Sequence, residues 1–459
     1  MIRHPFQPKA SVFLALVVAL ATLATLLPQP ANAQRAQLSF VRDAEIEALV
    51  AEYAAPLMRA ARLRKGSVNF YIVNDPSFNA FVSGSGMFIH TGLLLQAEDP
   101  NEVIGVVAHE LGHIVGGHQI RLRERIENAT RIAKWTSLLG LGIGAAGAAS
   151  GSNDLGRAGF GIAASSGSFA LRDILRYKRD EETSADRTAV KLLAATKQSG
   201  KGMLNTFRRL ARNTNILSGR IDPYLLSHPT PNERIATLRS TVRQSPFFNR
   251  KSSGSQKKRH DMVRAKIAAY VGGTRYANSV LNDKNLHPDA RLYGQAILAY
   301  LYGSPKRALP MIDKLLKRNP KNAYVHEMKG EILLRSGKAA AAVAPFRRAV
   351  QYDKTGAGFI RVELGHALLE SGSKKNLDEA ISELRKGVSR DPTAVKGFQF
   401  LAIAYGRKGD TPRALLASAD YAIRTGQKDR AKDFARRAQL KFKRGTPGWL
   451  RAEDIINVN

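Results

Sequence analysis

The chain has 459 residues and a formal net charge of +33, which points to an anionic partner or surface. The absence of cysteine excludes disulfides, thiolate catalysis and cysteine-ligated zinc, so any metal site must consist of histidines and carboxylates. A hydrophobic share of 44% is typical of a folded protein, and the length predicts two or three domains.

The first 33 residues are expected to be a secretory signal peptide. Arg3 and Lys9 precede an uncharged apolar run over residues 12–27, and small residues at 31–33 are typical of a cleavage site. The run of about 16 residues is shorter than the roughly 20 that a membrane span needs, which favours cleavage after Ala33 over an uncleaved anchor. We therefore expect an exported protein of a bacterial periplasm, with no nucleic acid as a partner.

The next segment predicts a helix followed by two short strands. The apolar spacing over residues 43–63 fits one amphipathic helix. Residues 68–73 are expected to form a strand, and a Ser/Gly turn at 83–86 precedes a second strand over residues 87–90. A new helix is then expected to begin near Pro100, because Pro is favoured at the first helical position.

This second helix carries the sequence His-Glu-Leu-Gly-His before Gly116 and Gly117 weaken or end it. His109 and His113 share one helix face and can place imidazole nitrogens on one metal ion. Glu110 lies one residue round from that face and can reach a water at the metal, from which it can pass a proton to a leaving amine. Neutral imidazoles leave the charge of zinc intact, so the ion can lower the pKa of that water towards about 7.

A catalytic zinc site needs a third protein ligand, and two candidates follow. His118 extends an HExxHxxG pattern, but that pattern places its third histidine one residue later, where Gln119 stands. We therefore reject His118 as a ligand and interpret it as a polar residue just past the helix. Glu182 is the better candidate because it shares a helix face with Asp186, whereas Glu181 points about 100° away. Taken alone, this stretch is more typical of a solvated charged helix than of a metal site.

Residues 136–170 are almost free of charge, and two interpretations remain open. They form either a core hairpin of small-residue helices or a flap that faces a membrane or a partner. Further helices are expected over residues 171–196, 202–212 and 232–243. A loop containing His228 precedes the last of these helices, and residues 246–262 are expected to be a basic linker.

From residue 263 to residue 459 the pattern changes to helical repeats of about 34 residues. Small residues at positions 308, 342, 380 and 414 head the second helix of successive units, and in the first three units larger residues follow four positions later. This spacing lets neighbouring helices interlock and resembles tetratricopeptide repeats, with a generic all-α domain as the alternative. Residues 251–459 also carry most of the positive charge, with 41 basic and 19 acidic side chains.

Residues from about 42 to 245 resemble the M48 family of zinc metallopeptidases, gluzincins with an HExxH helix and a downstream ExxxD helix. The matching pieces are residues 79–81, 91–94, 109–113 and 182–186, together with His228, Pro229 and Arg234. The resemblance implies one zinc ion per chain, held by His109, His113 and Glu182. It also implies that Glu110 is the general base and that Asp186 supports a ligand histidine by a hydrogen bond.

The resemblance implies further roles near the zinc. The strand beside it would be a sheet edge onto which an extended peptide adds as another strand. The residues expected to bind substrate in this way are Gly86, Met87, Phe88 and Ile89. His228 would either stabilise the oxyanion of the tetrahedral intermediate or close the fourth zinc position and silence the enzyme. Arg234 would hold the His228 loop or assist the oxyanion.

The expected fold is mostly α, of α+β class: a gluzincin-type peptidase domain with a small sheet, followed by an α-helical solenoid. The expected segments are a signal peptide (1–33), the peptidase domain (34–245), the linker (246–262) and the repeats (263–459). The first functional hypothesis is an exported zinc endopeptidase that cleaves misfolded or stalled envelope and outer-membrane proteins. The second is a periplasmic chaperone or assembly scaffold with a largely latent protease site. Expected partners are unfolded or misassembled envelope proteins, the outer-membrane protein assembly machinery and an anionic membrane surface.

Overall fold

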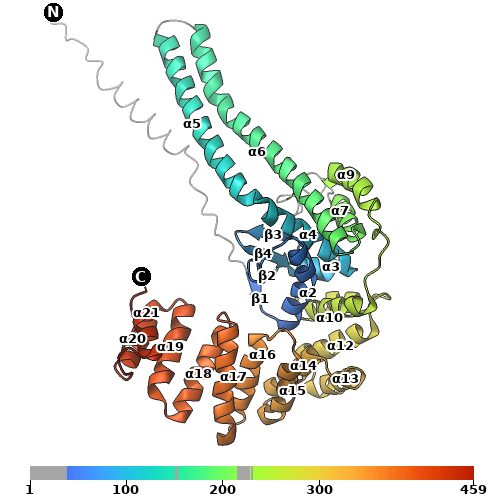
Figure 1. The fold of residues 1–459 in the computed structure, drawn as a ribbon, viewed down its shortest axis with the longest axis vertical. Coiled ribbons are helices and arrows are strands. Elements are labelled where there is room, and N and C mark those ends of the chain that lie inside the picture. Colours follow the sequence, from blue (N-terminus) through green and yellow to red (C-terminus); the bar gives the residue numbers. More distant parts are fainter. Residues whose placement is uncertain (1–38, 150–152, 214–227, 229–230, 459) are drawn as a thin grey trace, which may run out of the picture. The chain divides into compact units, whose positions relative to one another are not determined.

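The computed structural model describes residues 39–149, 153–213, 228 and 231–458 (Figure 1). The predicted signal peptide and its cleavage site lie outside these residues. The described chain is mostly helical with one small sheet, as the sequence predicts. None of its described helices is both long enough and apolar enough to cross a membrane.

The sheet and the helices around it come first in the chain. The strands are β1 (Phe40–Val41), β2 (Asn69–Val73), β3 (Ala80–Ser83) and β4 (Gly86–His90). The helices are α2 (Ala44–Ala60), α3 (Thr91–Gln96), α4 (Pro100–Gly116), α5 (His118–Ala149), α6 (Asn153–Ala195), α7 (Lys201–Asn213) and α9 (Pro231–Arg243).

The helices of the second half follow one another with short connections. They are α10 (Gly254–Val271), α11 (Gly273–Leu281), α12 (Pro288–Tyr302), α13 (Pro305–Arg318), α14 (Ala323–Arg335), α15 (Ala339–Tyr352), α16 (Gly358–Glu370), α17 (Leu377–Arg390), α18 (Val395–Lys408), α19 (Thr411–Arg424), α20 (Lys428–Gln439) and α21 (Pro447–Ile456). A short 3-10 turn, η2 (Lys374–Asn376), precedes α17.

The strand order β1-β2-β4-β3 places β4 inside the sheet. β4 runs parallel to β2 and antiparallel to β3, so Phe88 has Tyr71 on one side and Phe81 on the other. The expectation that residues 86–89 form a sheet edge is therefore wrong, because both sides of β4 are hydrogen-bonded to neighbouring strands. The edge strand that packs near the motif helix is β3.

Helix α4 begins and ends where the sequence predicts. The side chain of Asp99 caps it by accepting a hydrogen bond from the backbone N–H of Asn101, and Pro100 occupies the first turn. Gly117 ends the helix with φ 64°, a left-handed conformation that glycine adopts without a steric penalty. The helix is buried from Glu102 to His113, so the metal-binding motif lies within the core rather than on the surface.

Helices α5 and α6 form a long hairpin, side by side over much of their length (Figure 1). Several of its large apolar side chains are exposed: Trp135, Leu138 and Leu139 each expose at least 60% of their surface. This exposure argues against the core interpretation of residues 136–170, as far as those residues are described. This exposed apolar surface on α5 suits a partner or a membrane that covers it.

Helix α10 replaces part of the predicted linker. It begins at Gly254 behind a capping box in which the Ser253 hydroxyl and the Gln256 side chain each bond the other's backbone N–H. Val263 and Ile267 belong to the hydrophobic core shared with α2 and α4, while other α10 residues pack into the core of α12 and α13. Residues 254–262 are thus ordered helix, and α10 belongs to two cores at once.

The helices from α12 to α19 pack as antiparallel pairs whose contacts follow the predicted small-to-large pattern. Ala342 and Phe346 of α15 are both fully buried. A Cβ atom added at Gly330 of α14 would lie 2.7 Å from the Phe346 ring, and one added at Gly365 of α16 would meet the side chain of Leu384. Glycine in the first helix therefore makes room for the large residue of the second, which is how the pairs interlock.

Candidate metal centre

Two helices bring the predicted ligands together. α4 carries His109 and His113 four residues apart, and α6 crosses it with Glu182. The crossing is close because Gly112 faces α6: a Cβ atom added there would lie 2.7 Å from the carbonyl oxygen of Ala185. The sequence analysis assigned no role to Gly112, although glycine inside a buried helix is itself a signal of a close backbone approach.

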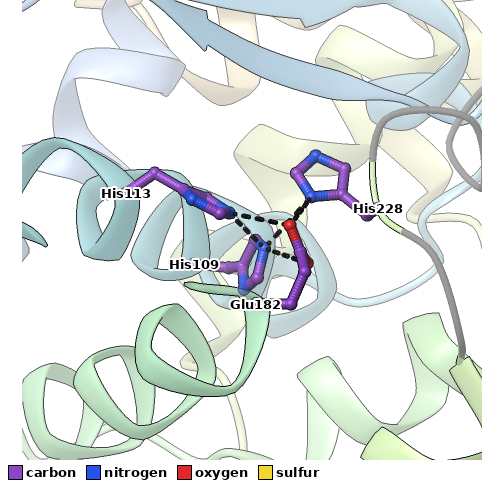
Figure 2. A group of neighbouring side chains, drawn as sticks. All are labelled: His109, His113, Glu182 and His228. Atoms are coloured by element: carbon purple, nitrogen blue, oxygen red, sulfur yellow. Dashed lines mark hydrogen bonds and ion pairs between the residues drawn. The ribbon is translucent and has the colours of Figure 1, made fainter. Parts of the chain in front are cut away.

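The three predicted ligands and His228 form one buried group, shown in Figure 2. Their candidate ligand atoms all lie within 4.8 Å of one another. The Nε2 atoms of His109 and His113 each lie 3.3 Å from an oxygen of Glu182, and Nδ1 of His228 lies 2.9 Å from the same carboxylate. The geometry therefore offers a metal ion three nitrogen donors and one carboxylate.

Glu110 lies beside this group without joining it. It is fully buried, and neither of its carboxylate oxygens accepts a hydrogen bond from the described residues. Oε1 lies 3.4 Å from Nε2 of His228. Burial raises the pKa of Glu110 to about 7, which suits a general base that works near neutral pH.

Asp186 and Arg234 hold the other side of the group. Oδ1 of Asp186 lies 2.8 Å from Nδ1 of His109, which leaves Nε2 of that imidazole directed at the ligand group. Arg234 donates two hydrogen bonds of 2.8 Å to Asp186, and its Nη1 lies 2.8 Å from Glu182. Its guanidinium also stacks 4.5 Å above the Phe207 ring. Arg234 thus contacts both carboxylates that lie beside His109.

The charges of the site fit a bound cation. Burial alone would lower the pKa of His109, but hydrogen bonds to Asp186 and Glu182 raise it to about 9. Burial would raise the pKa of Glu182, but His228 and the two α4 histidines hold it well below its usual range. Two imidazole nitrogens and a buried carboxylate, with a fourth donor within reach, match the ligand types and number that zinc prefers.

A pocket of about 290 Å³ opens beside the group and reaches the sheet edge. It is lined by Phe81 and Val82 of β3 and by the start of α5, as well as by Glu110 and His113. The side-chain amide of Gln119 donates to the carbonyl oxygen of Val82, and its oxygen accepts from the backbone N–H of Gly84. The pocket therefore joins the candidate metal centre to β3, and not to the strand that the sequence analysis selected.

A buried group of three histidines and one carboxylate, with a second buried carboxylate beside it, is typical of a metallopeptidase centre. In agreement with this class, residues 41–242 match the model of peptidase family M48. Residues 41–242 therefore form a peptidase M48 domain, and the chain is a metallopeptidase with zinc as the metal that this family implies.

Relatives cover both halves of the chain. The Beta-barrel assembly-enhancing protease of Yersinia pestis is 24% identical over 391 residues, which cover 82% of this chain and 76% of that protein. The metalloprotease YcaL of Escherichia coli is 29% identical over 186 residues, 38% of this chain and 62% of that protein. The structure of the tetratricopeptide protein YrrB is 22% identical and covers 38% of this chain and 88% of its own, with a TM-score of 0.31.

Proposed function

We propose that this protein is an exported zinc endopeptidase that cleaves unfolded or misassembled proteins of the bacterial envelope. The observation that carries the proposal is the burial of Glu110, whose carboxylate accepts no hydrogen bond from the described residues, directly beside a four-donor metal group. The name of the Yersinia relative, which refers to β-barrel assembly, supports envelope and outer-membrane proteins as the substrate class. The same name supports the outer-membrane protein assembly machinery as a partner.

The residues divide into those that hold the metal and those that handle protons. We assign His109, His113 and Glu182 as the protein ligands of one zinc ion and Asp186 as the support of His109. When bound, zinc would act as a Lewis acid on the scissile carbonyl and lower the pKa of the attacking water. Glu110, which is fully buried beside the ligand group, would accept a proton from the attacking water and pass it to the leaving amine.

The substrate strand is assigned to the open edge of β3. Phe81 and Val82 line the pocket that reaches the metal group, so a peptide paired with β3 would pass the zinc. Gln119 now bonds the backbone of that edge, and a substrate strand would have to displace it. Pairing through the backbone carries little sequence preference, which suits an enzyme that acts on many unfolded chains.

The second candidate function is a chaperone or assembly scaffold with a latent protease site. The position of His228 favours it, because Nδ1 lies 2.9 Å from Glu182 and the imidazole belongs to the four-donor group. A catalytic zinc site keeps one position open for water or substrate, and four protein donors close it. We therefore assign His228 to the closing of the fourth position, which means that its imidazole must leave the group before cleavage.

One set of variants tests both candidates. Zinc content and cleavage of an unfolded substrate are measured for the wild type, Glu110→Gln, His228→Ala and, as a control, His326→Ala, which removes a buried histidine from α14. Cleavage that Glu110→Gln abolishes while zinc stays bound supports the protease. If His228→Ala cleaves the substrate and the wild type does not, the latent site is supported. Stoichiometric zinc without any Glu110-dependent cleavage, even in His228→Ala, contradicts the proposed enzyme activity.

We further propose that the α5–α6 hairpin binds an anionic membrane surface. Trp135, Leu138 and Leu139 of α5 are exposed, and the exposed cations Arg131 and Lys134 lie on the same helix. Apolar side chains combined with basic residues suit the boundary of an anionic lipid layer. The repeats, which carry much of the chain's positive charge, are assigned to the docking of acidic protein partners.

The membrane proposal is tested by sedimentation with vesicles of phosphatidylglycerol or of phosphatidylcholine. We expect binding to the anionic vesicles that weakens as salt rises and that falls in the double variant Leu138→Ser/Leu139→Ser. The control is Leu440→Ser, which removes a leucine that is 87% exposed at the end of α20. Equal binding to both lipids, or no loss in the double variant, contradicts the proposal.

A further inference from the structure

His118 lies against the metal group although it is not part of it. The chain ends α4 at Gly117 and returns, so that Nδ1 of His118 lies 2.9 Å from Nδ1 of His113. The two rings meet edge to face, 4.9 Å apart between centroids. His118 exposes only 3% of its surface, which is unusual for a polar residue at a helix start.

The ring atoms define which nitrogen carries each proton. Nε2 of His113 faces the ligand group, 3.0 Å from Nε2 of His109, so the proton of neutral His113 belongs on Nδ1. Nδ1 of His118 must then accept that proton's hydrogen bond, which places the proton of neutral His118 on Nε2. That Nε2 lies 2.6 Å from a carboxylate oxygen of Glu181. The hydrogen bond therefore runs from His113 to His118, whereas the contact with Glu181 is an electrostatic one, because Nε2 of His118 has no hydrogen-bond partner among the described residues.

Glu181 is itself held in place by α5. Its two oxygens each accept a hydrogen bond of 3.2 Å from Arg121, whose Nε donates to the hydroxyl of Tyr177. Arg121 belongs to α5, while Tyr177 and Glu181 belong to α6, so the chain of contacts joins both helices of the hairpin base. Glu181 and Glu182 are neighbours in sequence, yet one faces His118 and the other faces the metal group.

Two glycines make this arrangement sterically possible. A Cβ atom at Gly116 would overlap the imidazole ring of His118, so only glycine leaves room for the ring at that position. Gly117 takes the left-handed conformation that turns the chain back. The sequence analysis treated these glycines only as a helix end, and it rejected His118 as a ligand. The second conclusion agrees with the geometry, because His118 contacts a ligand histidine and lies outside the four-donor group.

We propose that His118, oriented by Glu181, is a positioning residue that sets the tautomer and ring orientation of the zinc ligand His113. Asp186 contacts Nδ1 of His109 in the same way, so each histidine ligand has a partner at the ring nitrogen that faces away from the ligand group. The inference rests on the proposed function only in taking His113 as a zinc ligand. Hydrogen-bond partners of this kind typically change metal affinity by about 10–100-fold when they are removed.

The test is zinc affinity, measured by competition with a chromophoric chelator on the full chain. We expect His118→Ala and Gly116→Ala to weaken zinc binding about 10–100-fold, the second by displacing the ring rather than removing it. Glu181→Gln removes the negative charge beside Nε2 of His118 but keeps a polar side chain of the same size, so it should lose less zinc affinity than Glu181→Ala does. The spectrum of the cobalt-substituted protein should shift in His118→Ala, because the orientation of a ligand imidazole changes.

Two matched variants control for simple loss of packing. His326→Ala removes a histidine that is 2% exposed and hydrogen-bonded to the carbonyl oxygen of Pro320, remote from the metal group in sequence and on α14. Gly406→Ala adds a Cβ atom on α18, where no atom lies within 4 Å. Both should leave zinc affinity and the cobalt spectrum unchanged.

The outcomes separate this inference from the proposed function. If His118→Ala and Gly116→Ala bind zinc within twofold of the wild type, the inference is wrong, even where Glu110-dependent cleavage shows that the enzyme is active. If both variants lose zinc affinity but neither the wild type nor any variant cleaves the unfolded substrate, the inference stands and the protease proposal falls. If His118→Ala does not fold, Gly116→Ala and Glu181→Ala decide the question by the same measurement.

Discussion

The close crossing of α4 and α6 makes Gly112→Ala the most informative single substitution. A Cβ atom at residue 112 would lie 2.7 Å from the carbonyl oxygen of Ala185 and 2.9 Å from its Cα, whereas ordinary contacts begin at 3.4 Å. α6 would therefore have to retreat by about 0.7 Å. Glu182 lies one turn before Ala185 on the same helix and would move with it.

That retreat exceeds what a zinc site tolerates, because metal–ligand distances are held to within about 0.2 Å. We expect Gly112→Ala to weaken zinc affinity at least tenfold and to lower the rate of peptide cleavage about 100-fold, as a 1 Å misplacement typically does. Chelator competition gives the affinity, and cleavage of an unfolded substrate at saturating zinc gives the rate.

Gly105→Ala is the matched control for this substitution. It lies on the same helix, and its added Cβ atom would meet Met203 of α7 at 2.9 Å, so it crowds a helix that carries no predicted ligand. It should lower the thermal midpoint but leave zinc affinity unchanged. Zinc affinity within twofold of the wild type in Gly112→Ala would refute the reasoning that the glycine sets the helix spacing at the site.

Three further predictions concern stability. Burial raises the pKa of Glu102 to about 7, so the folded protein binds this proton more tightly than the unfolded chain does and stability falls as pH rises from about 4.5 to 7; Glu102→Gln should therefore raise the thermal midpoint at pH 8 but not at pH 4.5, and an equal gain at both would contradict this. Lys266→Met leaves the buried carboxylate of Glu45, now 3.3 Å from the ammonium, without its cation, and should cost about 3–5 kcal/mol in denaturant unfolding; a second substitution, Glu45→Gln, should recover part of that loss. Zinc at about a thousandfold over its Kd should stabilise the protein by about 4 kcal/mol, and a chelator or Glu182→Ala should remove that gain in a thermal scan.

Much of the local structure follows from the sequence because its signals are local. Asp99 and Pro100 start α4, and Gly117 ends it, through interactions within a few residues. The spacing of His109 and His113 places both on one face of a helix whatever the rest of the chain does. The small-to-large pattern of the repeats likewise predicts helix pairs, because each pair packs against its neighbours in sequence.

Local sequence signals of this kind do not determine the order of the strands in the sheet. Residues 86–90 have the same strand propensity whether they form an edge or the interior of a sheet, and only the return of β3 beside β4 makes them interior. The linker prediction was wrong over residues 254–262 for a related reason: its Ser/Lys composition is polar, yet the helix that begins there buries Val263 and Ile267 further along.

By itself, the sequence determined the identity and spacing of the candidate ligands, the helices that carry them and the need for a metal site free of cysteine. Tertiary structure alone decided which side chains meet across those helices. It placed His228 2.9 Å from Glu182, turned Arg234 onto the carboxylates and folded His118 against His113. The physical reason is that spacing along a helix fixes only a direction, whereas a contact between helices depends on how closely their backbones approach, and here glycines at the crossing and at the turn set that approach.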